Sequence, residues 1–450
     1  MITWFAAVAL AKKPGPPPDL YAVAATLREQ ALASLEPMTE LTTMCDQIGH
    51  RLSGSPALEK AIVWTGEQMK ADGLQVGTEP VTVTKWVRGE ESATLHDPFP
   101  RDLSLLALGG SVGTPPGGIT AEVVAVTELA EVAGLGERAR GKIVLVDTPW
   151  TDYGRTVATR SGAAREAAKV GAVAALIRSV TPVSLDSPHT GMLRYEVDVP
   201  AIPAAALSTE DAALVHRLAD QGPVRVTLNL AAATVGEAPS HNVWGQVRGR
   251  ELPNEVVVLG CHLDSWDVGQ GAQDDGAGCV MVMEAAALIN SLPIKPRRTV
   301  RAVLFTNEEN GLAGGKTYAK IHTSERTVAA IEADTGSGAP LGFRVQAGAL
   351  AEPPPGTLTA LAPLQRLLEP IGATELTPGG AGADVGPVLE AGGGLGLGLS
   401  QDMTGYWPIH HTEADTIDKV DPVLLARGTA AVVVAAWWLA EVGTLPPTTP

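Results

Sequence analysis

The sequence predicts an α/β protein in which a mixed, mostly parallel sheet is covered by helices on both faces and the chain is interrupted by an inserted domain. Three observations support this prediction. Strands and helices alternate from Ser240 onward, and the segment from Asp19 to Leu74 has helical periodicity. The segment between Pro98 and Gly236 instead contains short strands separated by Gly/Pro turns. Apolar strands alternating with long helices are typical of a sheet buried on both faces.

Composition places the chain among globular proteins and excludes several functions. The 450 residues include 45% hydrophobic and 18% charged residues, which excludes a disordered chain. The formal net charge of -17, with no dense Lys/Arg stripe, argues against a nucleic-acid partner. Cys45, Cys261 and Cys279 are too few and wrongly spaced for a disulfide framework or a thiolate zinc site. Packing must therefore hold the fold together.

Residues 1–18 are predicted to be a leader. The apolar stretch Ile2–Ala11 resembles a short export signal, and the Pro-rich stretch Lys12–Pro18 follows it. Two basic residues directly after the apolar stretch oppose export, so a cytoplasmic location is the alternative to a periplasmic or extracellular one. The apolar stretch Gly428–Ala440 is shorter than the roughly 20 residues that span a bilayer. We predict a buried C-terminal helix there and no membrane span.

The predicted domain boundaries divide the chain into two parts. Residues 19–97 and 237–445 form the main domain, and residues 98–236 form the insert. Within the insert we expect strands and helices and find no catalytic cluster; the expected elements are strands Ala121–Val126 and Lys142–Val146, and helices near Gly162–Ala172 and Thr209–Ala219.

In the main domain, the expected elements place polar residues where strands end. The expected elements are strands Glu255–Cys261, Thr299–Phe305 and Thr327–Ile331, a helix that begins at Asp274-Asp275-Gly276-Ala277-Gly278, and a helix over Gly314–Ile321. Ligands of such sheets bind beyond the carboxyl ends of the strands. We therefore expect the functional site at this edge.

The first strand end contributes His262 and Asp264. Residues two apart in an extended chain point to the same face, so both can reach one site. A structural His–Asp pair is the alternative. Asp274 opens the following helix, where an acidic residue can serve as an N-terminal cap. The neighbouring glycines would also let the backbone approach a bound cation closely.

Further ligands follow the next strands. Glu308 and Glu309 are adjacent carboxylates after a buried strand, an arrangement that is costly unless a cation compensates it; a solvated loop is the alternative. One could coordinate a metal while its neighbour shuttles a proton. Asp334 follows the next strand, and the His410-His411 pair lies far downstream. Together these side chains offer the oxygen and nitrogen ligands that zinc prefers.

Four motifs resemble a known family. HLDSWDVGQGAQDDGAG, FTNEENGLAGGKTYAK, EADTGSGAP and YWPIHHTEADT are similar to the co-catalytic di-zinc exopeptidases of the bacterial leucyl aminopeptidase and glutamate carboxypeptidase type, most closely to their carboxypeptidase Q branch. The resemblance extends to residues 48–60, 189–195 and 201–205, and it covers nearly the whole chain beyond the leader. The insert resembles the protease-associated domain of that branch. A homodimer is also implied.

The resemblance implies two zinc ions and a role for each site residue. The implied ligands are His262 and Asp334 for one ion, Glu309 and His411 for the other, and Asp274 as the bridge. Glu308 would be the general base. Asp264 would orient His262 through its second ring nitrogen, and the Asp274-Asp275 peptide would be cis.

Other residues are expected around the metals. His411 is preferred over His410 as a ligand because it directly precedes Thr412 in a His-Thr-x-x-Asp-Thr pattern. We expect His410 to face the substrate. The pocket is expected to be shaped by Tyr406, Trp266 and Asp384, for which a purely structural role is the alternative.

The leading hypothesis is a zinc-dependent exopeptidase that hydrolyses short peptides, in particular unblocked dipeptides. An aminopeptidase with the same metal chemistry is the first alternative. A non-catalytic receptor is disfavoured because every ligand position is filled, and a glutaminyl cyclase is disfavoured by the bridging Asp274. Manganese or cobalt could replace zinc in such a carboxylate-rich site.

Overall fold

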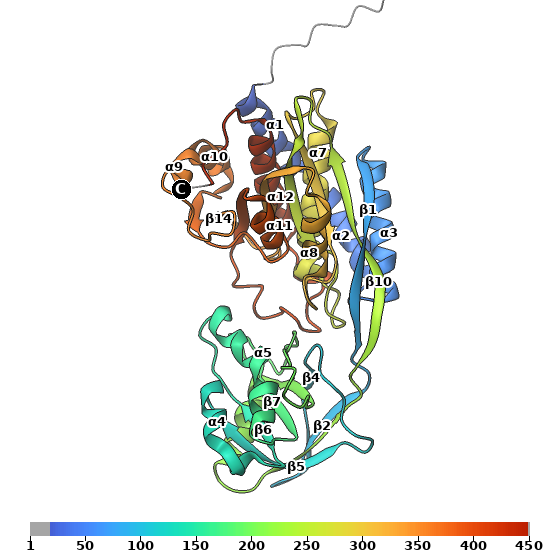
Figure 1. The fold of residues 1–450 in the computed structure, drawn as a ribbon, viewed down its shortest axis with the longest axis vertical. Helices are drawn as coiled ribbons and strands as arrows, with labels where there is room; N and C mark the ends of the chain where they lie inside the picture. Colours follow the sequence, from blue (N-terminus) through green and yellow to red (C-terminus); the bar gives the residue numbers. More distant parts are fainter. Residues whose placement is uncertain (1–18, 449–450) are drawn as a thin grey trace, which may run out of the picture.

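The computed structural model describes residues 19–448, which form an elongated molecule with two bodies (Figure 1). Each body is built around an eight-stranded sheet. The predicted leader, residues 1–18, lies outside the described residues. One body contains the elements from α1 to β1 and from β10 to α12, and the other contains the elements from β2 to β9.

The first sheet is mixed, with the strand order β1-β10-β12-β11-β13-β16-β14-β15. Its central strands run parallel, since β11 pairs with β12 and β13, and β13 pairs with β16. The pairs β1·β10, β10·β12 and β14·β16 are antiparallel. The strands are β1 (Gln75–Val87), β10 (Ala233–Val247), β11 (Leu252–His262), β12 (Arg298–Phe305), β13 (Arg326–Glu332), β14 (Pro340–Ala347), β15 (Glu375–Pro378) and β16 (Leu395–Gln401). The predicted mixed α/β class is therefore confirmed.

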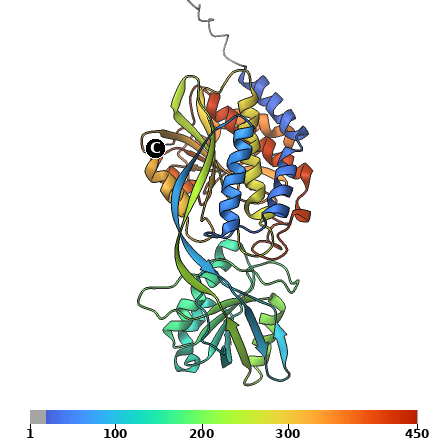
Figure 2. The ribbon, with the colours of Figure 1, turned by 90° about the vertical axis from the view of Figure 1, so that its right-hand side faces the viewer.

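Helices cover both faces of this sheet, as Figure 2 shows for one of them. Alternate residues of β11 belong to different cores: Val257 and Leu259 pack with the larger helix layer, whereas Val256 and Val258 pack on the opposite face. The larger layer comprises α1 (Leu20–Ala33), α2 (Glu36–Gln47), α3 (Pro56–Ala71), α7 (Ala277–Ser291), α10 (Ala362–Leu368) and α12 (Pro422–Glu441). Helices α8 (Ala313–Ile321) and α11 (Val385–Gly392) cover the other face.

Helix α12 is the apolar C-terminal helix that the sequence predicts, and it begins earlier than expected. Asp421 caps its N-terminus and Pro422 occupies the first helical turn. Among the described residues, α12 alone is long and apolar enough to cross a membrane by length and composition. It packs against α1 and α7 in the core, and 83% of its most apolar window is buried. This burial is typical of a core helix.

The second sheet has the strand order β3-β2-β9-β5-β6-β7-β8-β4, and its strand β2 begins at Glu91, before the expected start of the insert at residue 98. Its strands are β2 (Glu91–Leu95), β3 (Arg101–Leu103), β4 (Leu105–Ala107), β5 (Ile119–Val126), β6 (Ile143–Val146), β7 (Ala174–Arg178), β8 (Ala204–Leu207) and β9 (Arg225–Leu230). Helices α4 (Val132–Leu135), α5 (Tyr153–Lys169) and α6 (Thr209–Ala219) pack on it. Helix α5 begins well before the expected Gly162, because Asp152 caps its N-terminus.

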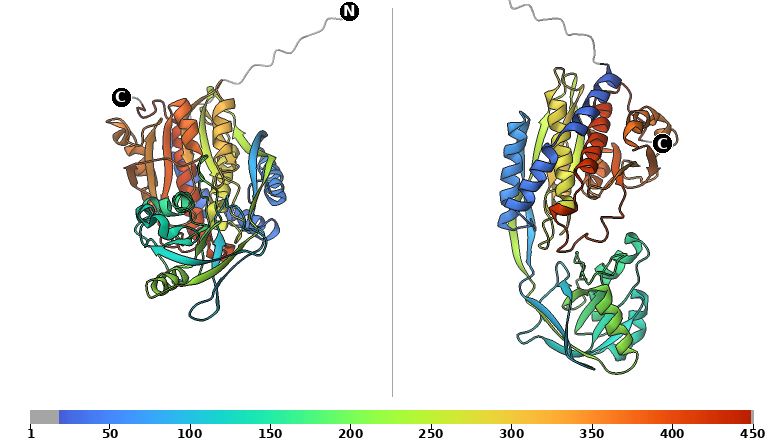
Figure 3. Two further views of the ribbon diagram at one scale, coloured as in Figure 1. Left: turned by 60° about the horizontal axis from the view of Figure 1, so that its bottom comes forward. Right: turned by 180° about the vertical axis from the view of Figure 1, so that it is seen from behind.

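A long antiparallel ribbon of β1 and β10 connects the two bodies (Figure 2). The sequence prediction did not include these strands. The ribbon brings the insert below the carboxyl ends of β11, β12 and β13 (Figure 3), where the loop before α12 descends toward α5. The insert is thereby placed at the edge where the site is expected.

Candidate metal centre

The predicted ligands converge because they follow neighbouring parallel strands. His262 ends β11, Glu309 lies just beyond β12, and Asp334 lies just beyond β13. The register pairs His262 with Phe305 of β12, so these strand ends are level with each other. Asp274 lies in the short turn η3 (Ala272–Gly276) before α7, where the backbone of Asp274 and Asp275 is not helical, and the loop before α12 supplies His411.

Asp274 lies between two imidazoles. Its Oδ1 is 3.1 Å from His262 Nε2, and its Oδ2 is 3.1 Å from His411 Nε2. His262 Nε2 is also 3.4 Å from Asp334 Oδ1, and His411 Nε2 is 3.2 Å from Glu309 Oε2. The five side chains therefore fall into two groups that share Asp274. This arrangement matches the ligand pairs that the sequence motifs imply.

The unsatisfied polar atoms and the charges of the cluster fit bound cations. Asp274 Oδ2 and Glu309 Oε1 are buried and have no hydrogen-bond partner. Burial raises the pKa of Glu309, and the nearby His411 offsets this only in part. For Asp274, burial acts to raise the pKa, but the His262 and His411 imidazoles together hold it well below its usual range. Burying ionised carboxylates without enough positive partners lowers the stability of the folded protein. Bound metal ions would supply the missing positive charge.

Glu308 lies beside this cluster with its backbone held in place. Burial raises its pKa well above the usual range, and the carboxylates of Glu309 and Asp334 raise it further, against the opposing effect of His262. A carboxylate with a raised pKa is a better proton acceptor, as a general base requires.

The structure corrects the expected contact of Asp264. His262 Nδ1 donates to the backbone carbonyl of Asp264 at 2.9 Å, not to its carboxylate. The carboxylate points the other way, where it accepts hydrogen bonds from Glu308 N and Ser53 Oγ, each at 3.0 Å. The turn after β11 thus orients the ring of His262 with a main-chain atom. The carboxylate instead fixes the segment that carries Glu308.

His410 lies closer to the ligand cluster than expected. Its ring stacks on His411 with 3.6 Å between centroids, and its Nε2 is 3.5 Å from Asp274 Oδ2. Burial lowers its pKa well below the usual range, and the neighbouring His411 lowers it further. Only His411 of the pair also contacts Glu309, which favours His411 as the ligand.

The three residues expected to shape the pocket are all buried near the site. Tyr406 packs against His410 with centroids 5.1 Å apart, and Trp266 packs against His411 at 5.6 Å. Asp384 lies next to Glu332, and neither of its carboxylate oxygens has a hydrogen-bond partner. Burial raises the pKa of Asp384 well above the usual range, and the nearby Glu332 and Glu308 add to this effect.

The sequence prediction missed the residues that support the turn around Asp274. Asp415 accepts hydrogen bonds from the backbone N–H groups of Gln273 and Asp274, at 2.7 and 3.1 Å. Arg51 is fully buried and donates to the backbone carbonyls of Leu263 and Gly271. Both residues lie within motifs on which the family resemblance rests. Those motifs were the sequence signal from which the two residues could have been found. The Asp274-Asp275 peptide is cis, as expected.

Comparisons with known proteins agree with this geometry. Residues 242–436 match Peptidase family M28, and residues 119–215 match the PA domain. Carboxypeptidase Q of Xenopus laevis is 40% identical over 405 residues, covering 89% of this chain and 85% of that protein. Carboxypeptidase Q of Homo sapiens is 39% identical, with 89% and 84% covered. The chain belongs to peptidase family M28. It is a metallopeptidase.

Solved structures share the M28 fold. The crystal structure of a Peptidase M28 precursor from Shewanella amazonensis has a TM-score of 0.90 and 37% identity, covering 96% of this chain and 99% of that one. A zinc aminopeptidase from Bacillus subtilis has a TM-score of 0.67 and 22% identity, covering 91% and 96%. The second likeness shows the fold alone.

The PA domain of this M28 peptidase contacts the cluster, although the sequence analysis predicted no catalytic cluster in that domain. Arg160 of α5 places its Nη1 3.3 Å from His411 Nδ1. Tyr153 stacks on Trp407 with 4.7 Å between ring centroids. His189 Nδ1 donates to the carbonyl of His410 at 2.7 Å. The motif that contains His189 was the only sequence signal for these contacts.

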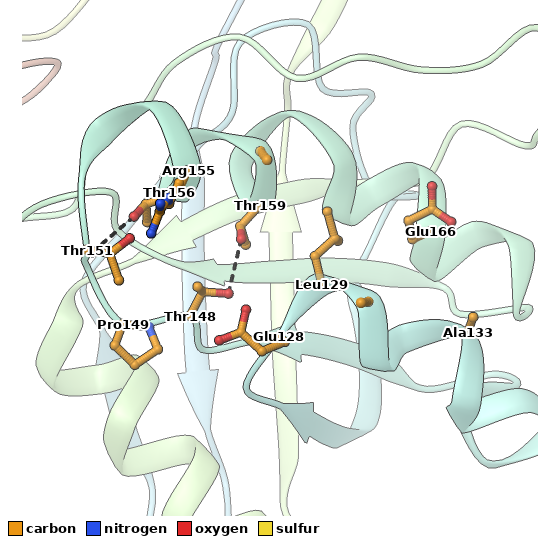
Figure 4. Close-up of a pocket in the computed structure, with 12 residues that line it drawn as sticks. Glu128, Leu129, Ala133, Thr148, Pro149, Thr151, Arg155, Thr156, Thr159 and Glu166 are labelled. Atoms are coloured by element: carbon orange, nitrogen blue, oxygen red, sulfur yellow. Dashed lines mark hydrogen bonds between the residues drawn. The ribbon is translucent and has the colours of Figure 1, made fainter.

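A separate cavity lies elsewhere in the PA domain. It encloses about 570 Å³ between the segment around Leu129 and helix α5, and the hydrogen bond from Thr159 Oγ1 to Thr148 Oγ1 crosses its wall (Figure 4). None of its lining residues belongs to the metal-ligand cluster. A smaller cavity of about 180 Å³ lies next to Tyr406 and Gln273.

Proposed function

We propose that this protein is a zinc-dependent exopeptidase that hydrolyses short peptides, in particular unblocked dipeptides, at a site for two zinc ions. The observation that carries the proposal is the position of Asp274 between His262 and His411, each of which has a second carboxylate beside it. His262 and Asp334 would hold one ion, Glu309 and His411 the other, and Asp274 both. Imidazole and carboxylate ligands suit zinc.

The chain's own residues supply proton transfer. When bound, zinc ions polarise a scissile carbonyl and acidify a water molecule. Glu308 would accept the proton of that water and deliver it to the leaving amine, because burial and the neighbouring carboxylates raise its pKa. Asp264 would keep Glu308 in position through the hydrogen bond to its backbone N–H.

The relatives support the exopeptidase class, and the position of the PA domain supports the preference for short peptides. Relatives named carboxypeptidase Q align with 89% of the chain, including the PA domain. Arg160 and Tyr153 of that domain lie against the ligand loop, so the substrate has limited space on that side. An aminopeptidase remains the second candidate, since the Bacillus subtilis zinc aminopeptidase shares the fold.

Hydrolysis of blocked and unblocked dipeptides tests the proposal. The zinc-loaded protein is given one free dipeptide, the same dipeptide blocked at its carboxyl end, and the same dipeptide blocked at its amino end. We expect cleavage only when both ends are free. Cleavage that tolerates the carboxyl block but not the amino block would indicate an aminopeptidase, and no cleavage of any substrate would favour a binding module.

A Glu308→Gln variant is the matched control for that experiment. The amide cannot accept the proton of the water, so we expect turnover to fall by about 100-fold or more, in the range typical for loss of a general base. Zinc content should stay near that of the wild type, because Glu308 is not one of the proposed ligands. Unchanged turnover would contradict the assignment of Glu308 as the base.

Export and dimerisation remain proposals. The apolar stretch Ile2–Ala11 supports export, and the family resemblance supports a homodimer. Fractionation of producing cells with N-terminal sequencing tests the first, and sedimentation equilibrium tests the second.

A further inference from the structure

A short segment of the PA domain, His189–Gly191, is hydrogen-bonded to the loop that carries His411. Thr190 N donates to the carbonyl of His411 at 3.0 Å, and His411 Nδ1 donates to the carbonyl of Thr190 at 3.2 Å. His189 Nδ1 donates to the carbonyl of His410 at 2.7 Å. Two successive residues of the insert therefore bond two successive residues of the ligand loop.

The contact with Thr190 O influences which ring nitrogen of His411 is free to bind a metal ion. A backbone carbonyl can only accept, so Thr190 O favours the tautomer of His411 that carries its proton on Nδ1, against Arg160 Nη1, a donor that lies 3.3 Å from the same nitrogen. The lone pair then lies on Nε2, which faces Asp274 and Glu309. A hydrogen bond to the second ring nitrogen is the usual means by which proteins orient a histidine ligand.

The backbone of His411 also needs external support. Its φ of 62° lies in the left-handed region, which costs energy for a residue with a side chain. Thr190 N and His189 Nδ1 hold the carbonyls of His411 and His410, the two peptide groups that define this turn. Without the segment, nothing described on that side of the loop would hold these carbonyls in place.

The segment itself is firmly seated. His189 is 1% exposed, and its N–H donates to Ser179 Oγ at 2.8 Å. Thr190 Oγ1 donates to the carbonyl of Ala107 at 2.8 Å. Gly191 has a φ of +133°, and an added Cβ there would lie 2.4 Å from the guanidinium of Arg160. The segment is therefore a fixed part of the PA domain.

We infer that His189–Gly191 is a positioning element for the metal site that contains His411, so that the PA domain controls retention of the ion held by His411 and Glu309. This inference rests on the proposed two-zinc function. His189 is a positioning residue: its hydrogen bond to the ligand loop is with the backbone carbonyl of His410, and it acts through that carbonyl. The inserted domain would thus determine occupancy of one metal site as well as enclose the substrate.

Two substitutions of His189 separate positioning from bulk. In His189→Asn the side-chain amide nitrogen can occupy the place of Nδ1 and keep the hydrogen bond, whereas in His189→Gln it reaches the place of Nε2 and loses it. The control is His216→Gln, which removes another histidine hydrogen bond of the PA domain, to Asp147 at 2.9 Å. Each protein is titrated with a zinc chelator while bound zinc per chain and the melting temperature are measured.

We expect the wild type, His189→Asn and His216→Gln to keep both ions over the same chelator range. We expect His189→Gln to release one ion at a chelator concentration lower by about 10-fold or more, the usual effect of losing a partner behind a metal ligand. Its second ion should be retained as in the wild type. Cobalt-substituted protein should show the same selective loss in its visible absorption spectrum.

Wild-type retention by His189→Gln would overturn the inference, and so would equal loss in His189→Asn and His189→Gln. If His189→Gln does not fold, His189→Ala replaces it under the same criteria. A wild-type protein that binds fewer than two zinc ions would instead contradict the proposed function on which the inference rests. The two failures are therefore distinguishable in one experiment.

Discussion

The carboxylate of Asp264 shows how one residue can serve a role different from the one its position predicts. Because it accepts the N–H of Glu308 while its own backbone carbonyl holds His262, it should affect the proposed base and not the metal. We expect Asp264→Ala to lower kcat by about 10- to 100-fold, because a buried N–H left without a partner costs about 1–3 kcal/mol and shifts the segment. Zinc content and KM should stay near those of the wild type.

Asp264→Asn is the matched control, since its amide oxygen can still accept from Glu308 N. Steady-state kinetics with zinc analysis distinguish the two contacts. Loss of zinc from Asp264→Ala, with normal kcat per loaded site, would show that the carboxylate orients His262 after all.

Three of the five predicted ligands could be found from the sequence because they end or follow a strand, whereas Asp274 opens a helix and His411 was assigned through the family resemblance. His262, Glu309 and Asp334 follow three expected strands, and the edge of a parallel sheet brings them together. Arg160 could not be found this way, because it contacts His411 from 251 residues away through a separate domain. A strand pattern predicts neighbours within a sheet, and it says nothing of how two domains meet.

At the scale of the element, helix α7 packs closely against the loop after β13 because residue 278 is a glycine. A Cβ added at Gly278 would lie 1.9 Å from the carbonyl of Ala333 and 2.3 Å from Asp275 Oδ1. We expect Gly278→Ala to lower the free energy of unfolding by about 1–3 kcal/mol or more, because neither contact atom can move freely. Urea denaturation measures this change.

Gly386, in helix α11, provides the control for Gly278. A Cβ there would meet no atom within 4 Å, so Gly386→Ala should be neutral or stabilising by about 0.5–1 kcal/mol. Equal effects of the two substitutions would contradict the close packing of α7 on the strand-end loops. The sequence predicted this helix because its Gly-rich start precedes a long apolar run, yet spacing alone could not show what the glycine approaches.

Helix α2 carries a buried carboxyl group that should make stability depend on pH. Burial raises the pKa of Glu40 to about 8, and the neighbouring Asp72, Glu36 and Glu284 add to this effect. The folded protein therefore binds this proton more tightly than the unfolded chain, whose pKa is about 4.5. The stability contribution is complete below about pH 4.5 and is lost as the pH rises to about 8.

The Glu40→Gln variant cannot ionise and should escape this loss. We expect its melting temperature to exceed that of the wild type by a few degrees at about pH 9, and to match the wild type far more closely at about pH 5. Exposed Glu29→Gln on α1 is the control and should change neither value. A difference that is the same at both pH values would show that the amide acts through packing.

The whole molecule depends on a connection that the sequence pattern did not reveal. Change of texture predicted an insert over residues 98–236, whereas the β1·β10 ribbon that orients the second body was not expected. Burial alternates along β1 from Glu79 to Thr84, a period-2 signal that the sequence analysis did not use, whereas the first residues of β10 are exposed on both faces and show no alternation. The position of the PA domain over the site is therefore a property of the ribbon and of its contacts with the ligand loop.

Because the ligand cluster joins strand ends, α7, the loop before α12 and the PA domain, metal removal should weaken the whole structure. Without cations, the buried Asp274 and Glu309 and the partly buried Asp334 repel one another, and ions that bind only the folded state stabilise it by mass action. We expect a chelator to lower the melting temperature by several degrees, and added zinc to restore it. Calorimetry measures this chelator-induced fall in melting temperature for the wild type and for two variants. The fall should be the same in Glu308→Gln, which keeps all the proposed ligands. It should be smaller in Glu309→Gln, which loses one of them. A chelator-treated, zinc-free wild type with an unchanged melting temperature would contradict the role of these residues as metal ligands.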